Sequence, residues 1–306
     1  MELIRGWVNI TQRHQGAVVA LGSFDGLHRG HQALIDKTIA QARAIGRPAM
    51  MLSFEPLPRE YFQAEPPARL TNFRERWRLL ERTGLHSLVL LHFNARLRNL
   101  SGIKFIRLVC EHLQIAGLVV GHDFRFGRDG EANAAFLTSL GARFGFTVEV
   151  IAPVCLGLER VSSSTLRTAL SFGRFAEAAQ ILGRSYTLRG RVVRGEQLGR
   201  TLGFPTANIR LKRRSMPLGG IYAVRVWGID AFVLKGVASL GTRPTVGGVE
   251  PWLETFIFDF DGELYGREIE IEFVAPLREE IHFSSLDALV KQMKCDVQCA
   301  RAILQD

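Results

Sequence analysis

The sequence contains little of what marks secreted and membrane proteins. No stretch approaches the roughly 20 apolar residues that a membrane-spanning helix needs, and the opening segment MELIRGWVNI lacks the basic and apolar regions of a signal peptide. We therefore expect a cytoplasmic protein with no membrane partner. Cysteines are too few and too scattered for a disulfide framework, since there are four, Cys110, Cys155, Cys295 and Cys299. Cys295 and Cys299 would share one helix face, but no histidine lies near them, so we expect them to serve helix packing.

Two familiar nucleotide-binding patterns are also absent. The sequence has neither the GxxxxGK[ST] of a P-loop nor the GxGxxG of a dinucleotide-binding fold, so it gives no support to either class. It does have 306 residues, 47% of them hydrophobic and 23% charged, which is enough for two globular domains.

The positive charge of the chain is uneven. The formal net charge of +9 divides into +7 over residues 1–183 and +2 over residues 184–306. A basic first half suits a polyanionic ligand, either nucleic acid or a nucleoside triphosphate. The run Lys212-Arg213-Arg214 has no interleaved aromatic residues, so we interpret it as a solvated loop rather than a nucleic-acid patch.

The first half alternates apolar strands with helical segments. Strands are predicted at 17–21, 49–54, 87–91, 117–121 and 147–152. Helices are predicted at 30–45, 73–83, 131–144 and 173–184, and a further helix follows Ser101. Strands that are apolar throughout and joined by helices predict an α/β domain with a Rossmann-like parallel sheet covered on both faces. Ligands in such sheets bind beyond the carboxyl ends of the strands.

The stretch AVVALGSFDGLHRGH, residues 17–31, is the first candidate site. A buried strand ends at Gly22, and His28 and His31 follow at the entrance of a helix, where free N–H groups favour an anion. Gly26 and Gly30 allow close backbone approach. The pattern predicts a phosphate site with two possible proton donors, although a bare HxGH also occurs in ordinary surface turns.

Two later segments of the first half carry further candidates. In GHDFRFG, residues 121–127, Asp123 offers a polar group and Phe124 and Phe126 offer aromatic faces to a flat ligand. The alternative is that Phe126 packs in the core and Asp123 caps a turn. In RVSSSTLR, residues 160–167, serines at a helix start and Arg167 one turn later suit an anion, although N-capping alone also explains the serines.

The second half has short alternating segments separated by glycine turns. EIEIEFV at 268–274 places apolar and acidic residues on opposite faces, and the lack of intervening helices predicts a small antiparallel β-barrel. An amphipathic segment at 284–303 would close it as a helix. In GRTLGFPTAN, residues 199–208, two glycines permit a loop folded against phosphate, and Thr206 and Asn208 offer oxygen ligands of the kind that Mg²⁺ prefers.

These motifs together resemble one family. GxFDGxHxGH at 22–31 is similar to the HxGH nucleotidyltransferases, and most closely to the adenylyltransferase half of bacterial bifunctional riboflavin kinase/FAD synthetases. GHDFRFG resembles the family's GxDFxFG flavin loop, and residues 161–167 resemble its ISSTxIR motif. GRTLGFPTAN looks like the riboflavin kinase signature. The resemblance implies an adenylyltransferase domain at 1–183 and a kinase domain at 184–306.

The resemblance also implies roles for individual residues. The catalytic residues would be Glu254, as the general base of the kinase, with His28 and His31. Flavin would bind at Asp123, Phe124 and Phe126, and Mg²⁺ at Thr206 and Asn208. ATP and its phosphates would bind at Gly22, Phe24, Asp25, Gly26, Gly30, Ser163, Ser164, Arg167, Gly199, Gly203 and Pro205. The implied substrates and products are riboflavin, FMN, FAD and ATP, with no redox cofactor and no nucleic acid, in a monomer or weak homo-oligomer.

The sequence departs from the family pattern at five positions, Leu57, His122, Ser164, Val246 and Phe256. The most consequential is Leu57, which replaces the histidine of FEPHP and removes a potential phosphate donor. The alternatives are a riboflavin kinase with a degenerate adenylyltransferase domain, another HxGH enzyme that makes coenzyme A or CDP-alcohol intermediates, and a basic nucleic-acid-binding protein. The other HxGH enzyme would leave GFPTAN unexplained.

Overall fold

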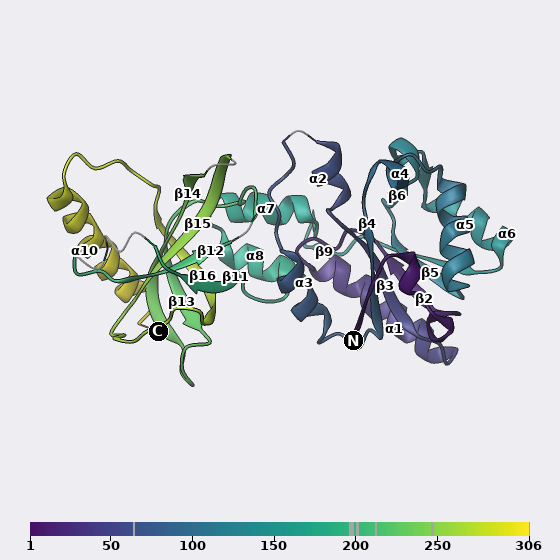
Figure 1. Cartoon of the computed structure of the whole chain (residues 1–306), viewed down its shortest axis with the longest axis horizontal. Helices are drawn as coiled ribbons and strands as arrows, with labels where there is room; N and C mark the ends of the chain where they lie inside the picture. The colour runs from purple at the N-terminus through teal and green to yellow at the C-terminus, as the bar shows by residue number, and fades with distance from the viewer. Residues whose placement is uncertain (64, 196–198, 200–201, 212, 246–247, 306) are drawn as a thin grey trace. The chain divides into compact units, whose positions relative to one another are not determined.

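The computed structural model describes residues 1–63, 65–195, 199, 202–211, 213–245 and 248–305 (Figure 1). Contacts divide the chain into two compact units. The first contains Met1–Pro67 and Phe73–Ser162, and the second contains Ala68–Asn72 and Ser163–Asp306. This division falls at Ser162, whereas the sequence predicts the end of the first domain near Gly183.

The first unit is built on a parallel sheet with the strand order β1-β4-β3-β2-β5-β8. The strands are β1 (Glu2–Arg5), β2 (Val18–Leu21), β3 (Ala49–Glu55), β4 (Ser87–His92), β5 (Gly117–Gly121) and β8 (Thr147–Ile151). The sequence predicts five of them and misses β1. That edge strand is only four residues long, and one of them, Ile4, is buried.

Helices cover both faces of this sheet, as predicted. Alternate residues of β2 point to opposite sides, so Val19 and Leu21 join one apolar core while Val18 and Ala20 join the other. Helices α5 (Gly102–Leu113) and α6 (Ala134–Phe144) contribute to the first core, and α1 (Arg29–Ala44) and α3 (Phe73–Leu80) to the second. Shorter elements are α2 (Pro58–Phe62), α4 (Ala95–Arg98) and the strand pairs β6 (Arg125–Phe126) with β7 (Ala132–Asn133) and β9 (Cys155–Leu156) with β10 (Glu159–Arg160).

The strand order creates a switch point beside β2. Strand β2 pairs with β3 on one side and with β5 on the other, so the chain leaves the centre of the sheet in two directions. Crevices for ligands form at the carboxyl ends of strands at such points. The HxGH loop follows β2 and the GHDFRFG loop follows β5, which places both predicted motifs at this edge.

The second unit contains a closed antiparallel barrel with the strand order β11-β12-β15-β14-β13-β16. The strands are β11 (Thr187–Val193), β12 (Thr206–Arg210), β13 (Gly220–Trp227), β14 (Leu234–Thr245), β15 (Gly248–Ile257) and β16 (Glu268–Arg278). The predicted helix at the carboxyl end is α10 (Leu286–Ile303). The sequence misses β12, because its residues belong to a motif that we interpreted as a phosphate loop.

Helices α7 (Ser163–Ser171) and α8 (Phe175–Leu182) pack together, and α8 lies against β16. The contact is aromatic. The ring of Phe175 stacks on Phe273 at 5.7 Å between centroids and meets the edge of Tyr222 at 5.6 Å. These helices therefore belong to the compact unit that contains the barrel.

Two expectations from the sequence are wrong. Arg213 is not in a solvated loop, because it is 6% exposed and donates hydrogen bonds of 3.0 Å to the carbonyl oxygens of Arg69 and Leu70. Lys212 lies outside the described residues. Cys295 and Cys299 do not pack, since both are exposed on α10. The described part of the chain contains no cluster of three His, Cys, Asp or Glu suited to a metal ion.

Candidate active sites

The loop between β2 and α1 brings the two histidines together. His28 is the N-cap of α1, and its Nδ1 atom accepts the backbone N–H of His31 at 3.4 Å. The two rings stack with centroids 3.7 Å apart. Gly30 leaves room for this, because a Cβ there would lie 3.2 Å from the His28 ring. The imidazoles thus form one pair at the positive end of the helix dipole, as the sequence predicts.

The protonation of this pair follows from its surroundings. Burial, and after it the positive charges of His28 and Arg76, hold the pKa of His31 well below its usual value. Within the described residues, the buried Nδ1 atom of His31 has no hydrogen-bond partner. Because Nδ1 of His28 accepts a hydrogen bond, a neutral His28 ring carries its proton on Nε2. The His31 ring is therefore neutral and can present an uncharged N–H donor to an anion.

The backbone before the histidines is unusual. Phe24, Gly26 and Leu27 have positive φ angles of 53°, 87° and 45°. The side chains of Phe24 and Asp25 are buried, and the Phe24 ring lies 5.2 Å from the His31 ring. Gly22 faces that ring, since a Cβ there would lie 3.3 Å from it. The Phe24 side chain therefore anchors the loop in the core.

Arg76 of α3 is a residue that the sequence analysis missed. Its side chain is fully buried beneath the loop and donates hydrogen bonds to the carbonyl oxygen of Ser23 at 2.9 Å and to the Glu55 carboxylate at 3.1 Å. An arginine on an amphipathic helix is usually solvated, so its position in the sequence gives no signal of this role.

The segment after β3 contains the FEP motif. Leu57, where the family has histidine, is 5% exposed and precedes α2, and its backbone N–H donates to the Glu60 carboxylate at 2.9 Å. The position is therefore filled by a buried apolar side chain at the start of a short helix.

In the loop after β5, Phe126 packs in the core, which is the alternative that the sequence analysis gave for this residue. Phe126 is 7% exposed in the core and stacks on the half-buried Phe124 at 5.4 Å. Asp123 is exposed and pairs with Arg160 at 2.6 Å, while His122 is 4.0 Å from the same carboxylate. Burial opposes ionisation of Asp123, but the hydrogen bond and charge of Arg160 prevail and lower its pKa.

The serine motif forms the start of α7, as predicted, within the second unit. Ser163 is its first residue and Ser164 is exposed. Arg167 lies half-buried and donates to the carbonyl oxygen of Ala68 at 2.6 Å and to that of Ser163 at 3.2 Å. The guanidinium thus braces the helix start and the short segment that contains Ala68.

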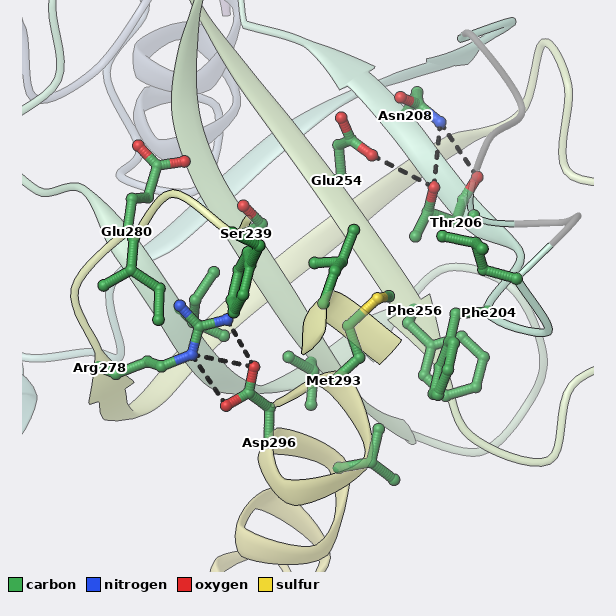
Figure 2. Close-up of a pocket in the computed structure, with 18 residues that line it drawn as sticks. Phe204, Thr206, Asn208, Ser239, Glu254, Phe256, Arg278, Glu280, Met293 and Asp296 are labelled. Carbon is green, nitrogen blue, oxygen red and sulfur yellow. Dashed lines mark hydrogen bonds and ion pairs between the residues drawn. The ribbon is translucent and has the colours of Figure 1, made fainter. Parts of the chain in front are cut away.

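In the barrel, paired strands bring Thr206, Asn208 and Glu254 together. Strand β12 pairs with β15, and Asn208 is directly opposite Glu254. Thr206 Oγ1 lies 3.4 Å from Glu254 Oε2, and the Asn208 amide nitrogen lies 3.1 Å from the Thr206 carbonyl oxygen (Figure 2). Trp252 donates its indole N–H to Asn208 Oδ1 at 2.9 Å. Since that N–H only donates, it fixes which end of the Asn208 amide is the oxygen.

The GFPTAN loop closes on itself beside these residues. The N–H of Phe204 donates to the Gly199 carbonyl oxygen at 2.7 Å. Gly199 must be glycine, because a Cβ there would collide with the carbonyl oxygen of Phe204. Gly203 has φ +84°, and the exposed Pro205 leads directly into β12. The loop thus holds its backbone close to the threonine and asparagine.

These residues line a cavity of about 330 Å³ between the barrel and α10. Figure 2 shows Glu254, Thr206 and Asn208 at one side with Phe204 and Phe256 below them, and Arg278, Glu280 and Asp296 at the other side. Phe256, where the family has histidine, meets Phe204 edge-on at 5.2 Å and adds to the apolar wall. Arg278 and Asp296 form a bidentate ion pair that joins β16 to α10. The cavity suits a flat, largely apolar ligand that carries polar groups at both ends. Val246, another departure, lies outside the described residues.

Comparisons with known proteins agree with this architecture. The family model for FAD synthetase matches residues 10–165, and that for riboflavin kinase matches residues 182–304. The chain is 41% identical to the bifunctional riboflavin kinase/FMN adenylyltransferase of Escherichia coli K12, over 98% of this chain and 97% of that protein. It is 43% identical to the protein of the same name from Pseudomonas fluorescens, over 99% and 98% of the two chains.

A crystal structure described as a macrolide-efflux protein from Streptococcus pneumoniae superposes with a TM-score of 0.83 at 32% identity, covering 98% of this chain and 99% of that one. In the residues described here, no helix is long and apolar enough to cross a membrane. One conclusion follows from the two family domains, from their order along the chain and from the identity to these relatives over the full length. The chain belongs to the bifunctional riboflavin kinase/FMN adenylyltransferases, which phosphorylate riboflavin to FMN and then adenylylate FMN to FAD.

Proposed function

We propose that Glu254 is the general base of the kinase reaction. It lies opposite Asn208 in the wall of the cavity and within 3.4 Å of Thr206, and this grouping carries the proposal. Glu254 takes the proton of the riboflavin 5′-hydroxyl as that oxygen attacks the γ-phosphate of ATP. Gly199, Gly203 and Pro205 hold the preceding loop against the phosphates. The apolar side of the cavity holds the flavin ring.

The polar residues fit the magnesium on which this family generally depends. Mg²⁺ prefers oxygen ligands, keeps several waters and is often shared between protein and phosphates. We propose that Thr206 Oγ1 and Asn208 Oδ1 hold it. When bound, Mg²⁺ neutralises the charge that develops on the phosphates. Trp252 uses one acceptor site of Asn208 Oδ1, and an amide oxygen has two, so one remains for the metal. The Asn208 amide nitrogen lies 3.4 Å from Thr206 Oγ1, and the metal would replace this contact.

In the adenylyl-transfer reaction, we propose that the FMN phosphate attacks the α-phosphate of a second ATP and expels pyrophosphate, with no covalent enzyme intermediate. His28 and His31 donate hydrogen bonds to the transferring group and stabilise its charge. The proposed contacts to ATP phosphates are Gly22, Phe24, Asp25, Gly26, Gly30, Ser163, Ser164 and Arg167, and those to the flavin are Asp123, Phe124 and Phe126.

We further propose that flavins are substrates and products of this chain and not redox cofactors. The proposed division of the activities is adenylyl transfer at residues 1–183 and kinase at residues 184–306. Nucleic acid and membrane are not partners in this proposal, and the protein acts in the cytoplasm as a monomer or weak homo-oligomer.

Flavin chromatography tests these assignments. Purified protein is incubated with riboflavin, ATP and Mg²⁺, beside Glu254→Gln and His28→Ala. The parent should make FAD. Glu254→Gln should make FMN about 10² to 10⁴ times more slowly yet still convert added FMN to FAD, and His28→Ala should accumulate FMN. Full kinase activity in Glu254→Gln would refute its role, and full FAD formation in His28→Ala would refute that of the histidine.

A further inference from the structure

We propose that Arg76 is a positioning residue for adenylyl transfer. It holds the loop that carries His28 and His31 in its reactive conformation without touching a substrate. The inference rests on the proposed role of the two histidines.

The geometry of Arg76 distinguishes it from a substrate ligand. Its side chain is 0% exposed, so no part of it faces a bound nucleotide. One guanidinium joins the carboxyl ends of two neighbouring strands: Nη1 donates to the Ser23 carbonyl oxygen at 2.9 Å, and Nη2 donates to Glu55 Oε2 at 3.1 Å and to the Phe54 carbonyl oxygen at 3.5 Å. Only the planar fork of arginine reaches such divergent acceptors at once, and a lysine ammonium does not.

The loop needs such a support because its backbone is strained. Phe24 and Leu27 have the positive φ angles that glycine adopts readily and other residues avoid. Strain of this kind persists only where the surrounding structure holds it in place. Ser23 directly precedes Phe24, and its carbonyl oxygen accepts from Arg76 and also from the Ser53 hydroxyl at 3.3 Å. Two buried donors thus fix the peptide at the start of the strained segment.

The direction of that peptide matters for an anionic substrate. In a planar trans peptide the C=O and N–H point in opposite directions, so a Ser23 carbonyl turned toward Arg76 sends the Phe24 N–H away from it. A carbonyl oxygen turned the other way would repel phosphate oxygens. Arg76 therefore keeps the negative end of this dipole inside the protein and the positive end available to the loop.

The test compares Arg76→Met and Arg76→Lys with Arg74→Met, which removes an exposed arginine from the same helix. Adenylylation of FMN is measured for kcat and for the KM of ATP, well below the unfolding temperature. We expect Arg76→Met to lose about 10 to 10² of kcat/KM for ATP, as misplaced reacting groups do. Arg76→Lys should recover little, and Arg74→Met should match the parent. Riboflavin phosphorylation by the same molecules should stay constant in all three and reports on folding and concentration.

A second measurement separates positioning from mere stability. Histidine-selective NMR follows the His31 ring, which can be assigned by its loss in His31→Gln. In Arg76→Met the resonances and the pKa of His31 should change. The resonances move because the loop shifts, and the pKa moves because the variant removes one of the two positive charges, Arg76 and His28, that lower it. A lower unfolding temperature with unchanged His31 resonances and unchanged KM for ATP would overturn the proposal, and so would equal losses in Arg76→Met and Arg74→Met. Failure of the histidine assignment would appear separately, as FAD formation by His28→Ala.

Discussion

Removing the Asp296 carboxylate should loosen α10 from the barrel and weaken riboflavin binding. Asp296 accepts from Arg278 Nε and Nη2 at 2.9 and 2.7 Å and from Gln292 Nε2 at 2.9 Å. Its side chain is 7% exposed, and that of Arg278 is 19% exposed. Asp296→Ala therefore leaves a largely buried guanidinium without this carboxylate.

The magnitude follows from that burial. Breaking a buried ion pair by removing one partner costs about 3–5 kcal/mol, since the remaining charge stays desolvated. Arg278 retains some contact with water, so the lower end applies, about 3 kcal/mol. At 1.4 kcal/mol per factor of ten, local opening of α10 should become about 10² times more frequent. Leu289, Met293 and Val297 of α10 line the cavity, so the KM for riboflavin should rise with it.

Hydrogen exchange of the α10 amides measures the opening directly. Asp287→Ala, which removes an exposed carboxylate from the first turn of the same helix, is the matched control. Adenylylation of added FMN should be unchanged in both variants. Unchanged exchange of α10 in Asp296→Ala, or an equal change in both variants, would refute this account of how the helix is held.

Three further outcomes are expected. Trp252→Phe removes the donor that orients Asn208, so the Mg²⁺ concentration for half-maximal kinase activity should rise about tenfold, the effect of losing one hydrogen bond of about 1.4 kcal/mol. An unchanged Mg²⁺ dependence would exclude the orienting role. Arg160→Gln should raise the pKa of Asp123, measured by carboxyl ¹³C NMR. The lowered pKa of Asp123 stabilises the folded protein at pH values above the pKa of this carboxyl in the unfolded chain. This stabilisation is lost as the pH falls through the pKa of Asp123 in the folded protein, so Arg160→Gln should lose it at a higher pH than the parent does. Leu57→His should lower the unfolding temperature without faster FAD formation, and faster FAD formation would mean that histidine there contacts phosphate.

Much of the fold follows from local patterns in the sequence. Strands β2, β3, β4 and β5 are mostly apolar, so their burial on both faces is visible without a structure, whereas β8 has no buried residue. The barrel strands alternate, as Ile269, Ile271 and Phe273 show on the inner face of β16. The histidine pair was predictable because the two residues lie three apart at a helix start, where spacing alone brings them together.

The rest depends on contacts between residues far apart in the sequence. Arg76 meets Ser23 across 53 positions, and Trp252 meets Asn208 across 44. Neither residue type signals such a contact, since arginine and tryptophan on amphipathic segments usually serve solubility or packing. Arg213 looked solvated for the same reason. Strand β1 was missed because pairing with β4, rather than its own composition, makes it a strand.

The packing of α7 and α8 limits where the chain can be cut into two folded fragments. Helix α7 carries the serine motif assigned to adenylyl transfer, while α8 places Phe175 on Tyr222 and Phe273 of the barrel. A kinase fragment that begins at residue 184 would expose the two barrel rings to water, and the complementary fragment would end with an uncovered Phe175. Each half would then be prone to aggregation. The two activities can be separated by replacing single catalytic side chains, whereas a cut between residues 183 and 184 damages both products.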